Sequence, residues 1–84
     1  MDKLEVIVYK STVCGGCDTV INFLKQNGIT PIERNIEEND EYAEEHRQYG
    51  YMSVPVVVTN DDTIKPFAGF DLNGMEQIIE ASKI

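Results

Sequence analysis

Residues 4–24 of the chain read LEVIVYKSTVCGGCDTVINFL, and the only two cysteines separate two different hydrophobic patterns. Residues 4–9 are rich in Val and Ile and alternate loosely, which is typical of a buried strand. From Cys17 the apolar residues recur at the i, i+3, i+4, i+7 spacing of an amphipathic helix, which Asn27-Gly28 would end. The pair Cys14-Gly15-Gly16-Cys17 therefore lies where a strand gives way to a helix.

The next two segments are predicted to be a strand and an acidic helix. Residues 29–36 carry Thr and Ile at even spacings, and Pro31 has to lie at the start or edge of this strand because proline has no N–H to donate. The acidic run that follows is predicted to be a helix with Asn39 or Asp40 as its N-cap and Gly50 as its terminator.

The last third of the chain is predicted to form two strands and a helix. Residues 54–59 are nearly all β-branched, as in a buried strand. The turn signal Asn-Asp-Asp at 60–62 leads into an expected short return strand over residues 63–67, whose Pro66 favours an exposed edge. Asn73 is expected to cap the final helix.

The resulting order is β-α-β-α-β-β-α. Its strand-helix-strand opening implies a parallel pair with a right-handed crossover, and the later turn implies an antiparallel pair. With 84 residues the chain has no room for a second core. We therefore predict one α/β domain over residues 1–84, with a four-stranded mixed sheet and helices on both of its faces.

The charge of the chain restricts its partners. A formal net charge of -8 repels the nucleic-acid backbone and anionic membranes, so neither is expected as a partner. The acidic stretch is interpreted as a solvated helix face in preference to a docking surface for a basic partner. No signal peptide and no membrane-spanning run of about 18 residues is recognisable, and we expect a cytoplasmic monomer. In that compartment a close cysteine pair indicates catalysis or metal binding more than a structural disulfide.

The spacing of the two cysteines suits thiol–disulfide exchange, which needs an attacking thiolate and a second thiol that resolves the mixed disulfide. Cys14 lies at the start of the helix, where free backbone N–H groups and the helix dipole favour an anion, so it is the predicted nucleophile. Cys17 is predicted to face the core and to resolve the mixed disulfide. We expect Lys10, if its side chain folds over the site, and Asp18 to tune the pKa of the Cys14 thiol in opposite directions.

Metal binding and an inert buried pair are the alternatives to redox chemistry. A zinc site needs about four ligands, and beyond the cysteines the chain offers only His46, in a separate predicted helix. Gly15 and Gly16 would expose the sulfurs, which argues against an inert pair. No metal site is predicted, and the expected redox group is the Cys14–Cys17 pair itself, with no other cofactor.

Three motifs together resemble a known family. They are VY at 8–9 leading to CGGC at 14–17, SVPVVV at 53–58, and FAGF at 67–70. Over essentially its whole length the chain resembles the glutaredoxin-like branch of the thioredoxin fold, and within it the NrdH-type redoxins that reduce ribonucleotide reductase. A lone C-x-x-C would be a much weaker signal than this combination.

The resemblance implies a substrate-facing segment at Ser53, Val54 and Pro55. In the family the proline of the Val-Pro step is cis and lies beside the cysteine pair; the alternative is an ordinary trans proline that opens a strand. The exposed backbone of Val54 would then pair with an extended substrate segment.

Three further positions are implied to contact a partner. Gly69 would let a partner backbone approach, and Phe70 would offer an apolar contact, with core packing as its alternative. Tyr9 corresponds to a tyrosine near the site in the family, although a strand aromatic needs no function.

Departures from the family pattern weaken a glutathione site. Ser11 stands where many glutaredoxins have a Lys or Arg, Ala68-Gly69 replaces a Gly-Gly pair, and Gly15-Gly16 replaces Pro-Tyr. The Arg-Pro-Asp that often follows in NrdH-type proteins is Asp-Leu-Asn at 71–73. The expected function is a dithiol carrier that takes electrons from a thioredoxin-reductase-type flavoenzyme and reduces ribonucleotide reductase or another protein disulfide. The alternatives are a glutathione-dependent glutaredoxin and a redox-sensing or metal- or cluster-binding module.

Overall fold

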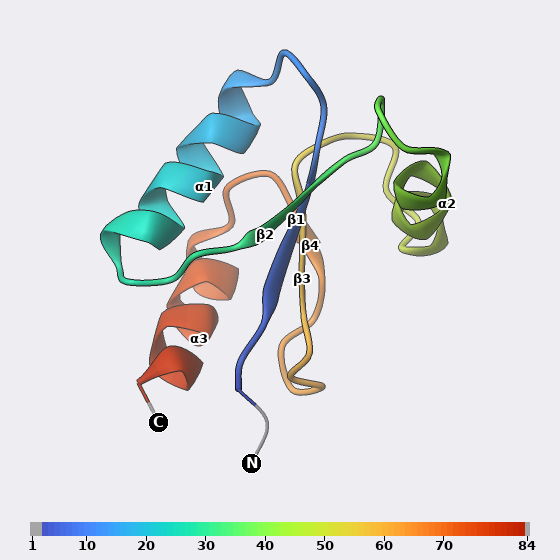
Figure 1. The fold of residues 1–84 in the computed structure, drawn as a ribbon. Helices are drawn as coiled ribbons and strands as arrows, with labels where there is room; N and C mark the ends of the chain where they lie inside the picture. The colour runs from blue at the N-terminus through green and yellow to red at the C-terminus, as the bar shows by residue number, and fades with distance from the viewer. Residues whose placement is uncertain (1–2, 84) are drawn as a thin grey trace.

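The computed structural model describes residues 3–83, so residues 1–2 and 84 of the expected domain lie outside the described part. Its strands are β1 (Val6–Lys10), β2 (Ile32–Asn35), β3 (Val56–Thr59) and β4 (Phe67–Ala68). They form one sheet in the order β2-β1-β3-β4, in which β1 is parallel to β2 and antiparallel to β3, and β3 is antiparallel to β4 (Figure 1). The predicted four-stranded mixed sheet is confirmed.

Three helices cover the two faces of this sheet. They are α1 (Gly15–Gln26), α2 (Asp40–Gln48) and α3 (Leu72–Ser82), and the element order is the predicted one. In Figure 1, α1 and α3 lie on one side of the sheet and α2 lies alone on the other. The fold is that of the thioredoxin-like α/β proteins. None of the helices within residues 3–83 is long and apolar enough to cross a bilayer.

The core has two parts because successive strand residues point to opposite faces. The larger cluster joins β1 and β3 to the apolar faces of α1 and α3, and it includes Val8, Val57 and Leu24. The smaller cluster, on the side of α2, contains Tyr9, Val56 and Val58. The β-branched run of β3 is therefore buried on both faces, as its continuous apolar pattern indicates.

Prolines shorten the predicted strands. The strand expected over residues 29–36 begins only after Pro31, and the one expected over 54–59 begins after Pro55. Because neither proline can donate to a ladder, each lies just before its strand. For the acidic helix, Asn39 is the N-cap: its Oδ1 accepts from the N–H groups of Glu41 and Tyr42 at 2.8 and 3.3 Å.

The predicted return strand over residues 63–67 is wrong in its extent. β4 contains only Phe67 and Ala68, because the preceding residues form a hydrogen-bonded turn. The Asp61 carboxylate accepts from the N–H and hydroxyl of Thr63 at 2.9 and 2.6 Å, and the Ile64 N–H donates to the Asp61 carbonyl at 3.0 Å. An aspartate that bonds its own neighbours competes with strand pairing here.

The predicted cap of the last helix is also wrong. Asp71 is the N-cap of α3, and its Oδ1 accepts from the Gly74 N–H at 3.2 Å, whereas Asn73 lies inside the first turn. Gly74 explains the position of the helix, because a Cβ there would fall 2.4 Å from Cε1 of the buried Phe67 ring. Only a residue without a side chain lets the helix approach the ring this closely.

Candidate active site

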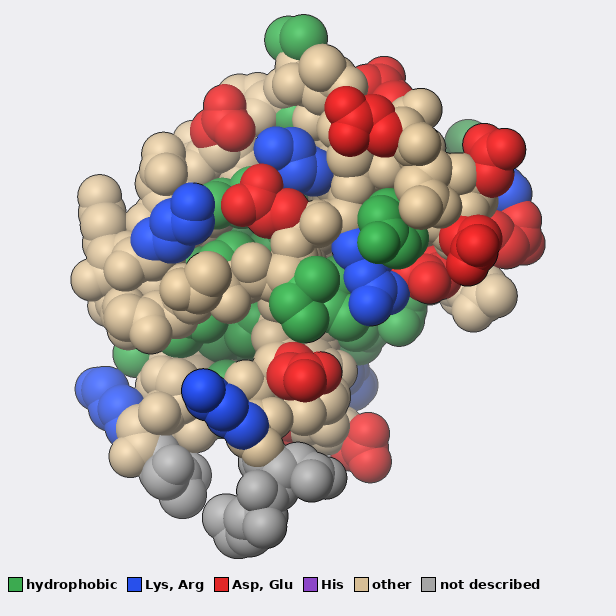
Figure 2. Space-filling view, viewed as in Figure 1, with side chains coloured by type: hydrophobic (Ala, Val, Ile, Leu, Met, Phe, Trp, Pro, Cys, Tyr) green, Lys and Arg blue, Asp and Glu red, His purple; other side chains and the backbone are tan. Residues whose placement is uncertain are grey.

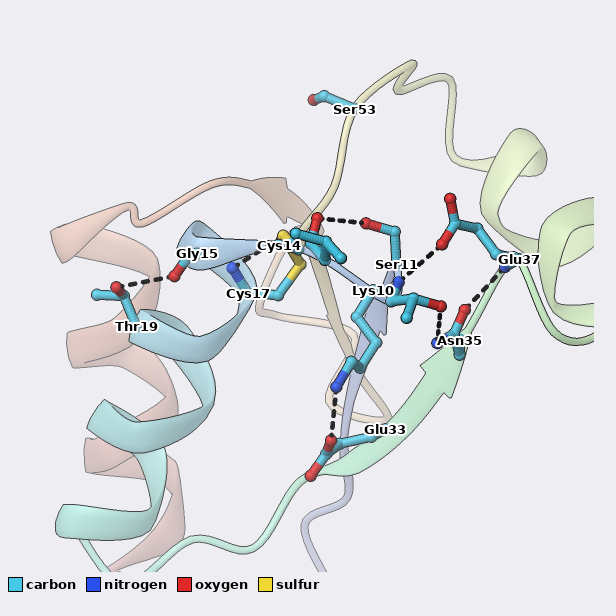
Figure 3. Close-up of a disulfide and its surroundings, with 12 residues drawn as sticks. Lys10, Ser11, Cys14, Gly15, Cys17, Thr19, Glu33, Asn35, Glu37 and Ser53 are labelled. Atoms are coloured by element: carbon cyan, nitrogen blue, oxygen red, sulfur yellow. Dashed lines mark hydrogen bonds and ion pairs between the residues drawn. A yellow bond between two sulfur atoms is a disulfide. The ribbon is translucent and has the colours of Figure 1, made fainter.

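The two cysteines are joined by a disulfide at the start of α1, with their Cα atoms 5.2 Å apart (Figure 3). Cys14 is the N-cap, in extended conformation, and its Sγ accepts a hydrogen bond from the Cys17 N–H at 3.1 Å. One of the free donors of the first helical turn is thus directed at the Cys14 sulfur. Such a donor, together with the helix dipole, stabilises a thiolate there on reduction.

The two sulfurs differ in exposure. Cys14 is half-buried, whereas Cys17 is 0% exposed and faces the interior. Gly15 and Gly16 are exposed, and nothing lies within 4 Å of where a Cβ on Gly15 would be. An incoming disulfide can therefore reach Cys14, while Cys17 lies behind it.

The Val-Pro segment lies beside the cysteine loop. The Val54–Pro55 bond is cis, and a Cβ on Gly16 would lie 3.5 Å from Pro55 Cδ. The Gly69 N–H donates to the Pro55 carbonyl at 2.8 Å, with Gly69 at φ +71°, a conformation that favours glycine. The structure thus brings Pro55 and Gly69 together at the end of the molecule that carries the disulfide.

The backbone of Val54 is unpaired beside the cysteine loop. Within residues 3–83 neither its N–H nor its carbonyl has a hydrogen-bond partner, because β3 begins two residues later. The exposed Ser53 precedes it, and the Ser53 carbonyl lies 2.8 Å from Nε2 of His46. An extended polypeptide could therefore add its own backbone hydrogen bonds at Val54.

The two aromatic residues expected at the site lie in different surroundings. Phe70 is 46% exposed, and its ring packs edge-on against Phe23 of α1 at 5.1 Å, so it combines packing with an open face. Tyr9 is only 2% exposed, and its hydroxyl donates to Oε1 of Glu45 at 2.8 Å. Burial, and then the bond to Glu45, raise the pKa of Tyr9 to about 12. The structure does not bring the Tyr9 side chain to the surface that carries Cys14.

The two charged residues expected to tune Cys14 are also placed differently. The Lys10 ammonium lies 3.3 Å from Oε1 of Glu33, and Figure 3 shows the Lys10 side chain directed away from the disulfide. It does not fold over the site, because Glu33 on the neighbouring strand β2 attracts it. Asp18 is exposed in the first turn of α1, and its N–H donates to the Cys14 carbonyl at 3.2 Å.

Two residues that were not among the predicted site residues, Asn35 and Glu37, hold the segment before Cys14 by hydrogen bonds. Oε1 of Glu37 accepts from the Thr12 N–H at 2.8 Å, and Asn35 Nδ2 donates to Thr12 Oγ1 at 3.3 Å (Figure 3). The Thr12 N–H, as its largest cause, holds the pKa of Glu37 below its usual range. Within a run of solvated acidic residues no local signal distinguishes Glu37, since its partner lies 25 residues earlier.

Apolar and acidic side chains surround the site. Val13, next to Cys14, is 92% exposed, and Met52, next to Ser53, is fully exposed. Figure 2 shows Asp and Glu side chains on the upper end of the molecule, where Figure 1 places the start of α1. Among residues 3–83 no group of three or more His, Cys, Asp or Glu residues is placed to hold a metal ion.

Comparison with known proteins assigns the family. The family model described as Glutaredoxin matches residues 6–64. A point mutant of the thioredoxin-like protein BC3987 has a TM-score of 0.76 and 26% identity, over 90% of this chain and 95% of that one. Glutaredoxin grx-1 from Archaeoglobus fulgidus has a TM-score of 0.72 and 28% identity, over 89% and 85%.

A third solved structure shares the fold. The glutaredoxin-like protein NrdH-redoxin from Escherichia coli has a TM-score of 0.75 and 22% identity, over 87% of this chain and 92% of that one. No curated protein sequence matches the chain.

The family match includes the whole cysteine motif and the Val-Pro segment. The chain therefore belongs to the glutaredoxin family, and it is a thiol–disulfide oxidoreductase whose redox centre is the Cys14–Cys17 pair.

Proposed function

We propose that this protein is a cytoplasmic, monomeric dithiol carrier of the NrdH type. It takes electrons from a thioredoxin-reductase-type flavoenzyme and reduces a disulfide of a protein, with ribonucleotide reductase as the proposed substrate. The observation that carries the proposal is that the site combines two features: Cys14 can be reached by a partner, and the backbone of Val54 has no hydrogen-bond partner within the described chain. A protein strand can use both, since its backbone pairs with Val54 while its disulfide meets Cys14.

The reaction moves two electrons in two exchanges. The Cys14 thiolate attacks one sulfur of the partner disulfide, a mixed disulfide forms, and the other partner sulfur leaves as a thiolate that takes up a proton. Cys17, deprotonated, then attacks Cys14 Sγ; the Cys14–Cys17 bond forms and the second partner thiolate leaves. The reductase returns two electrons, and two protons from solvent complete the dithiol.

The surroundings of Cys14 favour a protein over glutathione. Glutathione carries carboxylates that need cationic partners, but Ser11 occupies the position where many glutaredoxins have a cation. The nearby Lys10 is engaged by Glu33 at 3.3 Å. The exposed apolar side chains of Val13 and Met52 instead suit a polypeptide surface.

The comparison with NrdH-redoxin supports the choice of electron donor. That Escherichia coli protein is glutaredoxin-like and is described as having a thioredoxin-like activity profile. The present chain shares the fold of that protein. The family match alone would equally suit glutathione as the donor, and the experiment below separates the two.

The test is an NADPH-coupled assay with two electron sources. The oxidised protein is mixed with either thioredoxin reductase or glutathione plus glutathione reductase, and oxidised ribonucleotide reductase is the acceptor. We expect NADPH consumption and product formation with thioredoxin reductase at a rate at least tenfold higher than with glutathione. A faster rate with glutathione would reject the proposed carrier role in favour of a glutathione-dependent glutaredoxin.

A further inference from the structure

His46 is the one buried residue of α2, at 5% exposure. Its Nε2 lies 2.8 Å from the carbonyl oxygen of Ser53, in the connection between α2 and β3. A carbonyl can only accept, so Nε2 carries the proton and donates this hydrogen bond. The one buried side chain of this helix is thus directed at the segment that contains Val54.

The ring of His46 is itself held by the sheet. It packs edge-on against the buried Tyr9 ring, with the centroids 6.1 Å apart. The preceding residue, Glu45, accepts from the Tyr9 hydroxyl at 2.8 Å and from the Arg34 guanidinium at 2.5 Å. Tyr9 belongs to β1 and Arg34 to β2. Contacts with both strands therefore fix this part of α2, and with it the His46 ring, relative to the sheet.

The segment that His46 contacts has little else to hold it. Met52 is fully exposed, Ser53 is exposed, and Val54 lacks a hydrogen-bond partner within the described chain. The next fixed point is Pro55, whose carbonyl accepts from the Gly69 N–H at 2.8 Å. In the part of the chain that the structure describes, the bond from His46 is the one hydrogen bond between residues 52–54 and the rest of the protein.

We infer that His46 is a positioning residue for partner binding. By holding the Ser53 carbonyl, it keeps the backbone of Val54 extended and available before a partner arrives. A partner strand then pays less of the entropic cost of ordering this segment, so it binds more tightly. The inference rests on the proposed function, in which a protein partner pairs with Val54.

Two amide substitutions test the bond, because they differ in reach alone. The side-chain nitrogen of Gln can occupy the place of Nε2, while that of Asn is one methylene shorter and cannot reach the Ser53 carbonyl. The probes are insulin as a protein disulfide and a low-molecular-weight aromatic disulfide. The full-length protein is kept reduced by thioredoxin reductase and NADPH, and KM and kcat are measured for each probe.

We expect His46→Asn to raise KM for insulin roughly 3- to 10-fold, the worth of one net hydrogen bond, with kcat within about twofold of the parental value. The rate with the small disulfide should stay within about twofold, since that probe has no backbone to pair with Val54. His46→Gln should restore the parental KM.

Val58→Ala distinguishes a general loss of stability from loss of the His46–Ser53 hydrogen bond. It truncates a side chain in the same core cluster as Tyr9 and leaves the Ser53 contact in place. It should lower stability without changing the insulin KM. An unchanged KM in His46→Asn, an equal rise in His46→Gln, or an equal rise in Val58→Ala would each overturn the inference. Failure of the proposed function differs from all three, because the parental protein itself would then not turn over insulin with thioredoxin reductase.

Discussion

The backbone N–H of Cys17 donates to the sulfur of Cys14 across 3.1 Å, so the fully buried cysteine supports the half-buried one. This contact arises because Cys14 is the N-cap of α1 and Cys17 lies in its first turn. The same geometry leaves Cys17 with no exposed surface, while Cys14 is half-buried. Cys14 is therefore placed to attack a partner disulfide and Cys17 to resolve the mixed disulfide, and we expect the two cysteines to behave differently when they are replaced or alkylated.

Replacing Cys17 by Ser should trap the mixed disulfide. Cys14 can still attack a partner disulfide, but no second thiol is present to release the product. The reduced variant, mixed with oxidised partner, should give a covalent complex on a non-reducing gel that dithiothreitol dissolves. Cys14→Ser should give no such complex, and multiple turnovers by Cys17→Ser in the absence of glutathione would contradict the two-cysteine mechanism.

Alkylation of the reduced protein should distinguish the two thiols. We expect iodoacetamide to modify Cys14 at least roughly tenfold faster than Cys17, because Cys14 is reachable and its thiolate is stabilised by the helix start. Peptide mass spectrometry after brief labelling measures the ratio. In urea the two thiols should react at similar rates, and a Cys17 that reacts first in the native protein would contradict the assignment.

Gly74→Ala should destabilise the fold. The new methyl group would meet the buried Phe67 ring at 2.4 Å, and either the ring or α3 has to move. Overpacking of this kind costs about 1–3 kcal/mol, measured by urea unfolding with the disulfide intact.

Gly15→Ala is the matched control for that substitution. It lies at the exposed start of α1, where nothing lies within 4 Å of the added Cβ, so it should be neutral or stabilise by about 0.5 kcal/mol. Equal destabilisation by the two substitutions would show that close packing on Phe67 is not the cause.

The stability of the protein should fall as the pH rises from 10 to about 12. The pKa of Tyr9 is raised from 10.0 to about 12 in the fold, first by burial and then by its bond to Glu45. The unfolded chain loses this proton at lower pH than the folded one, so between the two values unfolding is favoured as pH rises. Urea unfolding at several alkaline pH values measures this loss.

Tyr9→Phe provides the comparison, since it keeps the buried ring and removes the titrating hydroxyl. Its unfolding free energy should be lower below pH 10, because the bond to Glu45 is missing, and should decline less steeply above it. Parallel pH dependences for the two proteins would mean that Tyr9 does not titrate late in the folded state.

Local patterns in the sequence were sufficient for the element order and for the position of the redox pair. The period change at Cys14-Gly15-Gly16-Cys17 depends on neighbouring residues, and a helix start needs only its own backbone to favour an anion. Pro31 and Pro55 precede the first residues of β2 and β3, and the predicted strands were too long because they included both prolines, which have no N–H to donate. The cap at Asp71 was missed because the competing Asn73 is an equally good cap in isolation, and only the contact between Gly74 and Phe67 places the helix.

What decided the surroundings of the site were contacts between residues far apart in the chain. Lys10 turns to Glu33, 23 residues away, and Tyr9 is buried against Glu45, 36 residues away. No local period encodes such pairs, since they exist only once β1, β2 and α2 have packed. The sequence alone determined that the chain carries a reactive cysteine pair at a helix start. The tertiary structure decided which side chains face that pair, because sheet packing selects among partners that look equivalent along the chain.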